Sequence, residues 1–438
     1  MSLLTKDQTR RILEKVLSHS KAEGCEANLN GNVGGNIRYA RNTVTTSGVQ
    51  NNSTLAVQAN FGKKSGTATI NEFDDASLEK TVRRAEELAK LAPENPEFVE
   101  FLEPQTYLES KAYFDNTAKV TPEYRAQAAT NSIQPSRAKN LIAAGFLQDN
   151  ASFQAKINSK GLFAYHQQTD VNFSVTVRTN DGTGSGYVTR DYNDVAKLDT
   201  GAASQIAIEK AEMSKNPVAI EPGKYTVILE PAASIGLLQN MIFSFNARQA
   251  DEGRSFMAKA GGGTKLGEKI VDERVTIYSD PTHPEVPAAC WAGDGRPLEK
   301  TVWIEKGVVK NLFYPRYWAL KKGVKATPAP ANGIMEGGTA TLEDLIRDTQ
   351  KGILVTRTWY IRAVDPQTLL YTGLTRDGLY YIENGKIKHA IKNFRFNESP
   401  VIMLNNLEAL GKPVRIDGNF VPPMKIRDFT FSSLSDAV

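Results

Sequence analysis

Few residues of this chain are of the types that carry out metal-dependent or nucleophilic catalysis, and they lie far apart. The histidines and cysteines are His19, His166, His283, His389, Cys25 and Cys290. Zinc is held by imidazole, thiolate and carboxylate groups, often within short motifs such as HExxH or CxxC. The sequence contains neither motif, nor the GxSxG turn that exposes a nucleophilic serine. A zinc site would require long-range convergence, for example of His283, His389 and Cys290, whereas lone histidines are usually surface or hydrogen-bonded residues.

The stretch Lys224–Met257 joins a strand pattern to a helix pattern. An apolar run at 225–229 ends at Glu230-Pro231, and the apolar residues that follow are spaced three to four apart: Ile235, Leu238, Ile242 and Phe245. This spacing predicts a helix with one buried face. Proline is favoured near a helix start, because its missing N–H needs no partner there. A strand is therefore expected to lead directly into a buried helix.

The inner face of this helix carries no strong metal ligand. Its polar residues are Gln239, Asn240 and Ser244. Amide side chains bind zinc weakly, and buried polar groups are normally paired. Gln239 and Asn240 are therefore expected to be buried or half-buried amides that take part in hydrogen bonds.

Besides Lys224–Met257, the second half of the chain contains a series of distinctive motifs: Gly307–Leu312, Tyr314–Tyr317 with Ala319, Lys321–Gly323, Trp359–Pro366, Leu374–Gly378, Ile382–Ile387 and Asn393–Ser399. Together these motifs resemble the TldD/PmbA family, whose members were long called modulators of DNA gyrase and are regarded as a two-subunit metalloprotease. Their order and spacing carry the resemblance over about the last half of the chain. The N-terminal half fits in pattern only.

The resemblance has a direct implication for the metal site. In the metal-bearing subunit of the family, a helix with the pattern His-Glu-three residues-His binds the metal, helped by a cysteine near the C-terminus. These positions fall on Gln239, Asn240 and Ser244, and residues 412–425 contain no cysteine. The resemblance therefore implies the PmbA (TldE) type of subunit. Such a chain holds no cofactor itself and is not catalytic alone, and zinc is expected in a partner, a TldD-like homologue.

The resemblance also implies a place for substrate. In the family, the region corresponding to Pro328–Thr339 contributes to the interior that faces the substrate, where an extended peptide could add as an extra strand. The residues expected to line that channel are Asn332, Met335, Glu336, Gly337 and Gly338. The alternative is an ordinary surface loop.

The order of elements predicts an α+β protein, with N-terminal helix and antiparallel-sheet domains followed by a mostly β C-terminal domain. The expected domains are residues 1–95, 118–215 and 222–438, and the last carries the degenerate metal-site helix. Four short strands are expected to form an antiparallel meander in the central domain: Leu141–Gln148, Ala151–Asn158, Gly161–Gln168 and Val171–Thr179. Pro400–Gly411 is expected to be the last helix.

Composition is that of an ordinary globular protein. The chain has 438 residues, of which 40% are hydrophobic and 23% charged. The formal net charge of +4 is small and spread along the chain, which does not favour nucleic-acid binding. The N-terminus lacks the apolar core of a signal peptide, and no run approaches the roughly 18–20 apolar residues of a membrane span. With two distant cysteines, we expect no disulfide, no membrane association and a cytoplasmic protein.

Three functional hypotheses follow. The first is a non-metal protease subunit that pairs with a metal-bearing homologue to cleave unfolded or extended peptides. The second is a non-catalytic, homo-oligomeric peptide-binding or scaffold protein that pairs with itself. The third is an independent hydrolase, which would require titratable groups to converge beside Gln239.

Overall fold

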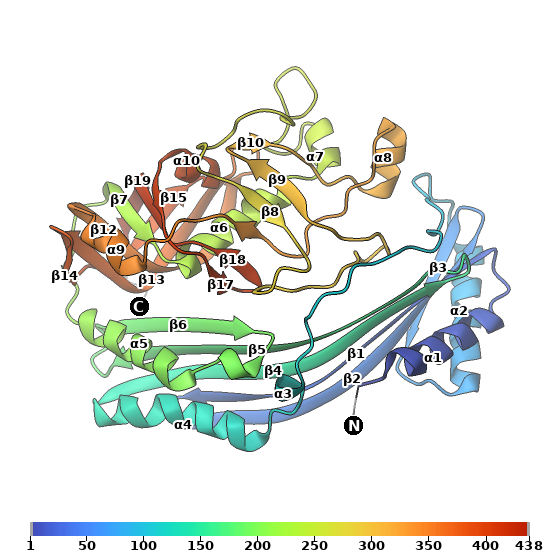
Figure 1. Ribbon diagram of the computed structural model, residues 1–438, viewed down its shortest axis with the longest axis horizontal. Coiled ribbons are helices and arrows are strands. Elements are labelled where there is room, and N and C mark those ends of the chain that lie inside the picture. The colour runs from blue at the N-terminus through green and yellow to red at the C-terminus, as the bar shows by residue number, and fades with distance from the viewer. Residues whose placement is uncertain (1–2, 436–438) are drawn as a thin grey trace.

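Two layers face each other in this protein: a six-stranded sheet with its helices, formed by the N-terminal half, and a larger β-rich part, formed by the C-terminal half (Figure 1). The computed structural model describes residues 3–435. Its elements confirm the α+β class and the mostly β character of the C-terminal part. The outermost ends of the expected first and last domains, residues 1–2 and 436–438, lie outside the described residues.

The N-terminal layer combines long strands with helices on one side. Its strands are β1 (Gly24–Ala40), β2 (Thr43–Phe61), β3 (Lys64–Ile70), β4 (Leu141–Asn158), β5 (Phe163–Thr179) and β6 (Ser185–Tyr192). Its helices are α1 (Lys6–His19), α2 (Asp75–Leu91), α3 (Asp115–Ala118), α4 (Pro122–Ala138), the 3₁₀ turn η1 (Val195–Lys197) and α5 (Thr200–Met213).

One sheet runs through both of the ranges expected as separate N-terminal domains. The strand order is β3-β2-β1-β4-β5-β6, so residues 1–95 and 118–215 each contribute three neighbouring strands. The junction is the antiparallel β1–β4 ladder, which extends without a register shift from Glu26 opposite Asn158 to Tyr39 opposite Gly145.

The prediction of four short central strands was wrong. Leu141–Gln148 and Ala151–Asn158 are parts of the single strand β4, and Gly161–Gln168, from Phe163 onward, and Val171–Thr179 are parts of β5. The Asp149-Asn150 pair favours a turn in isolation. Here both residues pair with β1 on one side and β5 on the other, and this two-sided pairing outweighs the local preference.

The two faces of the sheet differ in chemistry. Odd-numbered residues of β1 and β4, such as Leu29 and Ala155, pack beneath α1 and α2, and others, such as Tyr39 and Leu147, pack beneath α4 and α5. Because side chains alternate along a strand, even-numbered residues lie on the opposite face, which we call the inner face. Figure 1 shows that this face is turned toward the C-terminal layer.

The C-terminal layer is built from short helices and two further sheets. Its helices are α6 (Pro231–Phe243), α7 (Ala247–Asp251), α8 (Arg316–Lys322), α9 (Leu342–Arg347) and α10 (Pro400–Asn405). Its strands are β7 (Gly223–Leu229), β8 (Ile277–Ser279), β9 (Thr301–Glu305), β10 (Val308–Val309), β11 (Ile334–Met335), β12 (Lys351–Asp365), β13 (Leu370–Glu383), β14 (Lys386–Ala390), β15 (Phe394–Glu398), β16 (Leu407–Leu410), β17 (Val414–Ile416), β18 (Asn419–Val421) and β19 (Met424–Leu434).

These strands form one sheet ordered β10-β9-β8-β11-β18-β17 and another ordered β12-β7-β19-β15-β13-β14, with β16 paired to β19. The prediction of a helix over Pro400–Gly411 was wrong for its second half. The helix ends at Asn405, and Leu407–Leu410 pair with β19, because the buried Leu407 packs into the core as part of a strand.

Polar contacts join the two layers at the β6 edge. Arg415 of β17 donates to Asp191 of β6 through Nε, over 2.7 Å, and Ser185 Oγ donates to Asp377 Oδ1 over 2.7 Å. Lys210 of α5 and Glu230 form an ion pair of 2.6 Å, with both side chains largely buried. The long segment between α2 and α4 crosses from one layer to the other (Figure 1). Tyr107 in this segment donates to the Gly295 carbonyl over 2.7 Å.

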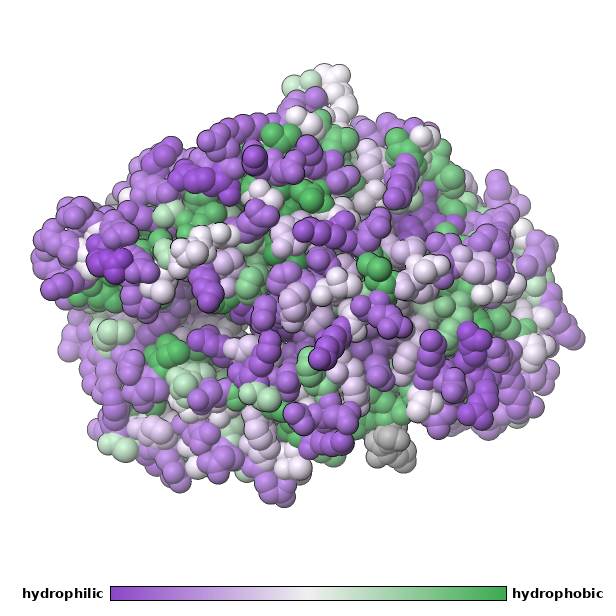
Figure 2. Space-filling model, viewed as in Figure 1, coloured by the Kyte–Doolittle hydropathy of each residue, from purple (hydrophilic) through white to green (hydrophobic). Residues whose placement is uncertain are grey.

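Hydrophilic residues cover most of the face shown in Figure 2, and the apolar residues there are scattered among them. Within residues 3–435, no helix has the length and apolar character needed to cross a membrane.

Asp170, in the contact region between the layers, has a carboxyl group whose ionised form lowers the stability of the fold. Burial raises the pKa of Asp170 on β5 to about 6, and the neighbouring Asp149 and Asp191 act in the same direction. Above pH 6 this carboxylate is ionised in the folded protein and therefore disfavours folding. Below the ordinary pKa near 4 the group is protonated in both states and costs nothing.

Asp170→Asn is therefore expected to raise the free energy of unfolding by about 1–3 kcal/mol above pH 6, with the gain disappearing as the pH falls toward 4. Urea unfolding followed by circular dichroism at several pH values measures this difference. Asp115→Asn, at an exposed carboxylate, is the control and should show no comparable gain. An Asp170→Asn effect that is independent of pH would contradict the assignment.

Candidate functional site

The helix that the sequence singles out is held at the centre of the C-terminal layer. Strand β7 lies between β12, to which it is parallel, and β19, to which it is antiparallel, and Val227–Leu229 are fully buried. Glu230 is the N-cap residue of α6 and Pro231 occupies its first turn, as predicted. Thr358 of β12 donates to the Ala233 carbonyl over 2.7 Å. The position of α6 is therefore fixed by β7, which leads into it, and by β12, which contacts it.

Helix α6 packs closely against β12. A Cβ at Gly236 would lie 2.8 Å from Cδ1 of Ile361, so a larger residue there would have to displace that side chain. Leu237 and Met241 are fully buried in the C-terminal core. The polar side chains of the helix are thus carried on a rigid support.

Of Gln239, Asn240 and Ser244, the last two donate hydrogen bonds to the backbone of the helix itself. Asn240 Nδ2 donates to the Gly236 carbonyl over 2.8 Å, and Ser244 Oγ donates to the Met241 carbonyl over 2.6 Å. Asn240 is half-buried and Ser244 buried, so Asn240 is the paired amide that was expected. Gln239 is also half-buried, and it faces a pocket.

This pocket, which we call the α6 pocket, has a volume of about 270 Å³ and is mostly apolar. Helix α6 forms one side of it, and β11 with the preceding loop and the β17–β18 hairpin form the others. The residues that line it are Ile235, Leu238, Gln239, Ile242, Phe243, Ile277, Pro330, Ala331, Asn332, Gly333, Ile334, Met335, Asp417, Gly418, Asn419 and Val421. Asp417 is the one ionisable side chain among them.

The β17–β18 hairpin is anchored to the N-terminal layer. Asp417 and Gly418 form its turn, both with positive φ, and the Gly418 N–H donates to Asp191 Oδ2 over 2.9 Å. Burial raises the pKa of Asp417, and the nearby Asp191 raises it further. One wall of the α6 pocket therefore depends on the contact between the layers.

The structure separates the five residues expected to line a peptide channel. Asn332 and Met335 line the α6 pocket together with Gln239, although they lie far from it in sequence. Glu336, Gly337 and Gly338 are exposed beyond the pocket and do not line it. Strand β11 lies between β8 and β18, with Ile334 paired on both sides and Met335 paired with β8, so the strand is not at an edge of the sheet where a peptide strand could add.

Asn332 has a structural role in this arrangement. Its side chain is 5% exposed and makes three hydrogen bonds: Nδ2 donates to the carbonyls of Asp280 and Val286, each over 2.7 Å, and Oδ1 accepts from the Asp280 N–H over 2.9 Å. These bonds leave the side chain little capacity to bind a ligand. Asn332 instead holds the loop that forms the pocket wall.

The residues present do not fit a zinc ion. Gln239 has a neutral amide, and Asn240 and Ser244 have committed their side chains to the helix backbone, whereas zinc requires imidazole, thiolate or carboxylate. His283, His389 and Cys290 do not converge either. Across residues 3–435 no group of three or more histidine, cysteine, aspartate or glutamate side chains is arranged to hold a metal.

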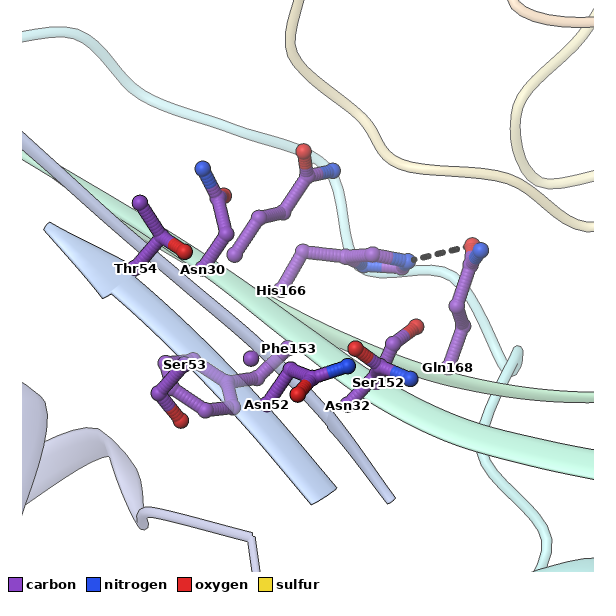
Figure 3. A pocket seen from close by; sticks show the side chains of 11 residues that line it. Asn30, Asn32, Asn52, Ser53, Thr54, Ser152, Phe153, His166 and Gln168 are labelled. Carbon is purple, nitrogen blue, oxygen red and sulfur yellow. Dashed lines mark hydrogen bonds between the residues drawn. The ribbon is translucent and has the colours of Figure 1, made fainter. Parts of the chain in front are cut away.

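A second concavity, the polar pocket, lies on the inner face of the N-terminal sheet and has a volume of about 320 Å³. Figure 3 shows Asn30, Thr54, His166 and Gln168 projecting to one side of the strands. His166 Nε2 lies 3.3 Å from Gln168 Oε1, and burial lowers the pKa of this histidine, so it is neutral at pH 7. The lining therefore offers many hydrogen-bonding groups and no charge. Sequence analysis missed this pocket, although the alternation of asparagines at 28, 30 and 32 was a usable signal.

Family models match three consecutive parts of the chain. They describe the PmbA/TldA metallopeptidase domain 1, over residues 25–89, the central domain, over residues 102–215, and the C-terminal domain, over residues 222–433.

Individual relatives are distant. An uncharacterized protein of Methanocaldococcus jannaschii is 26% identical over 275 residues, which are 62% of this chain and 62% of that protein. A protein of Methanothermobacter thermautotrophicus named a metalloprotease is 22% identical over 303 residues, which are 62% of this chain and 63% of that protein. The chain thus spans less than two thirds of the length of these curated relatives. TldE from Thermococcus kodakarensis has the same fold, with a TM-score of 0.87 at 18% identity, over 97% of this chain and 99% of that one.

Asn332→Ala is expected to lower the free energy of unfolding by about 2–4 kcal/mol, because it removes three hydrogen bonds and leaves the Asp280 N–H and the buried Val286 carbonyl without partners. Chemical denaturation followed by tryptophan fluorescence measures this loss. Asn172→Ala, at an exposed asparagine of β5, is the control and should change stability by no more than about 0.5 kcal/mol. Equal stability of the two variants would show that Asn332 is not structural.

Proposed function

This chain belongs to the PmbA/TldD family of metallopeptidases, and on that premise we propose that it is the subunit without a metal site. In this proposal it pairs with a metal-bearing homologue in the cytoplasm, and the pair cleaves unfolded or extended peptides. The zinc belongs to the homologue, and this chain contributes part of the peptide-binding surface.

One observation carries the proposal. The resemblance places the metal-site positions at Gln239, Asn240 and Ser244, and Gln239 lines a formed pocket, which supports a binding surface without metal ligands. An apolar pocket with a few oriented polar groups is the usual form of a small binding site. The pocket can take an apolar peptide side chain, with the Gln239 amide available to a peptide N–H or carbonyl. Because β11 has no free edge, we assign recognition to side-chain contacts rather than to strand addition at Pro328–Thr339.

The second candidate is a homo-oligomeric peptide-binding or scaffold protein without a protease partner. The same pocket would serve it, and the two candidates differ in whether a metal-bearing homologue is needed for function.

Co-expression with a homologue that carries the His-Glu-three residues-His helix tests the proposal. The complex is expected to contain stoichiometric zinc and to cleave unfolded polypeptides, and the isolated chain to contain neither zinc nor activity, because its helix offers no strong ligand. Metal analysis and a fluorescent casein digest measure both properties. Stoichiometric zinc in the isolated chain would overturn the proposal. Failure of the two chains to associate, with peptide binding retained by this chain alone, would favour the scaffold.

A matched pair of variants tests the α6 pocket. Phe243 lines the pocket and is 71% exposed, and Leu320 of α8 is equally exposed but lies outside it. Phe243→Asp is expected to weaken peptide binding about tenfold, because it places a charge where an apolar side chain would be buried. Leu320→Asp should leave binding unchanged. Fluorescence anisotropy with a labelled apolar peptide measures both, and equal affinities would remove the pocket from the proposal.

A further inference from the structure

Two rows of uncharged polar side chains cross the floor of the polar pocket on the inner face of the N-terminal sheet. The register aligns one row from β2 across β1 and β4 to β5: Thr54, Asn30, Gln154 and His166. The next inner-face row, in the same strand order, consists of Asn52, Asn32, Ser152 and Gln168. Both rows line the pocket (Figure 3). The floor is therefore a regular array of amides, hydroxyls and one neutral imidazole.

These rows cross β1 and β4, the two central strands of the sheet. Asparagine is disfavoured in strands, yet β1 has asparagine at three successive inner-face positions, Asn28, Asn30 and Asn32. The helix-facing residues between them, such as Ala27 and Leu29, are buried and apolar. Only the inner face thus departs from the residue types that strands prefer. Such a departure is expected where a surface has a function.

Several of the amides in the pocket have hydrogen-bonding groups that the protein does not use. Among residues 3–435, the side-chain amides of Asn30, Asn52 and Gln154 have no hydrogen-bond partner. Asn32 donates through Nδ2 to Asn150 Oδ1 over 3.2 Å, and its own Oδ1 accepts no bond from these residues. The floor therefore offers both donors and acceptors to a ligand.

The spacing of these side chains matches that of a polypeptide main chain. Residues i and i+2 of a strand lie about 6.5–7 Å apart, which is the separation of Asn30 from Asn32 on β1 and of Gln154 from Ser152 on β4. An extended peptide presents the N–H and C=O groups of every second residue along one edge, with the same repeat. A carboxamide has a donor and an acceptor and can bind both groups of one residue.

A ligand for this floor has to be uncharged, because the lining has no charge to offer it. The main chain of a polypeptide meets this condition. A neutral oligosaccharide has similar hydrogen-bonding groups, but its rings also have apolar C–H faces. The one carbocyclic ring in the lining, that of Phe153, is 3% exposed and packs in the core beneath α1 and α2, so it gives such a face no contact.

We propose that the polar pocket binds the main chain of an extended polypeptide, which lies over β1 and β4 along the strand direction with one edge toward the floor. Asn30 and Gln154 bind one residue of the polypeptide, and Asn32 binds the residue two positions away. Because no side chain of the polypeptide is recognised here, binding does not depend on its sequence. The inference rests on the proposed function in taking a polypeptide as the ligand, and it adds a second site to the α6 pocket.

A peptide made only of serine and threonine tests main-chain recognition, because it has no large apolar side chain for the α6 pocket. The same peptide N-methylated at every residue keeps its side chains and lacks main-chain N–H donors. Fluorescence anisotropy with the isolated full chain, without homologue or zinc, is expected to show binding of the first peptide and at least tenfold weaker binding of the second. A serine–asparagine peptide of equal length is expected to bind with similar affinity to the first.

A matched pair of double variants assigns this binding to the pocket. Asn30→Leu with Gln154→Met removes two amides and keeps the size of the side chains, and it is expected to weaken binding of the serine–threonine peptide about tenfold. Asn28→Leu with Gln58→Met is the control, because both residues lie on the inner face outside the pocket and donate to neighbouring side chains. The control should bind as the wild type does, and circular dichroism checks that both variants are folded.

Equal affinity for the N-methylated peptide, wild-type affinity of the Asn30→Leu/Gln154→Met variant, or a wild type that binds no serine–threonine peptide would each overturn the proposal. Displacement of the peptide by maltopentaose would overturn it as well, and would assign the pocket to a carbohydrate. No arm of this experiment uses the homologue, zinc, peptide cleavage or Phe243. Its failure is therefore distinct from a failure of the proposed function.

Discussion

The pairing of β7 with β12 and β19 is the constraint on which the candidate site depends. Val227–Leu229 are buried between two neighbours, so the chain leaves the sheet at one fixed point and enters α6 at Pro231. At Gly236 the helix comes close to the Ile361 side chain of β12. Because strands β7 and β12 hold the helix in place, its position does not depend on the chemical type of the side chains that it presents to the pocket. A catalytic group and a neutral substitute can therefore occupy the same place without a change of fold.

The support that the sheet gives to α6 is therefore separate from the chemistry of the side chains that the helix carries. Asn240 and Ser244 each donate a hydrogen bond to a backbone carbonyl of the helix. Gln239 remains on the surface of a pocket whose other walls come from β11 and from the β17–β18 hairpin. The hairpin is tied through Gly418 to Asp191 in the other layer. The shape of the site is therefore a property of both layers together.

Local patterns predicted the local structure well, and long-range structure poorly. The β7–α6 junction was predicted from an apolar run, a proline and apolar residues spaced three to four apart, all within one short segment. The length of β4 could not be predicted, because Asp149 and Asn150 favour a turn until two neighbouring strands pair with them. The family resemblance drew attention to Asn332 and Met335, but not to the three hydrogen bonds that make Asn332 structural. The polar pocket combines four strands, and no single segment of sequence displays it.

The β1–β4 ladder also has a consequence for the order in which the protein can fold. Strands β1, β2 and β3 are consecutive and can pair through short turns as soon as they leave the ribosome. Glu26 of β1, however, pairs with Asn158 of β4, so this contact can form only after the intervening chain has been synthesised. Bringing the two ends together also costs loop-closure entropy, which the contact must offset. Topologies dominated by such distant contacts fold slowly. One edge of β1 therefore stays unpaired until β4 has been synthesised. During that interval the nascent chain is open to incorrect strand pairing.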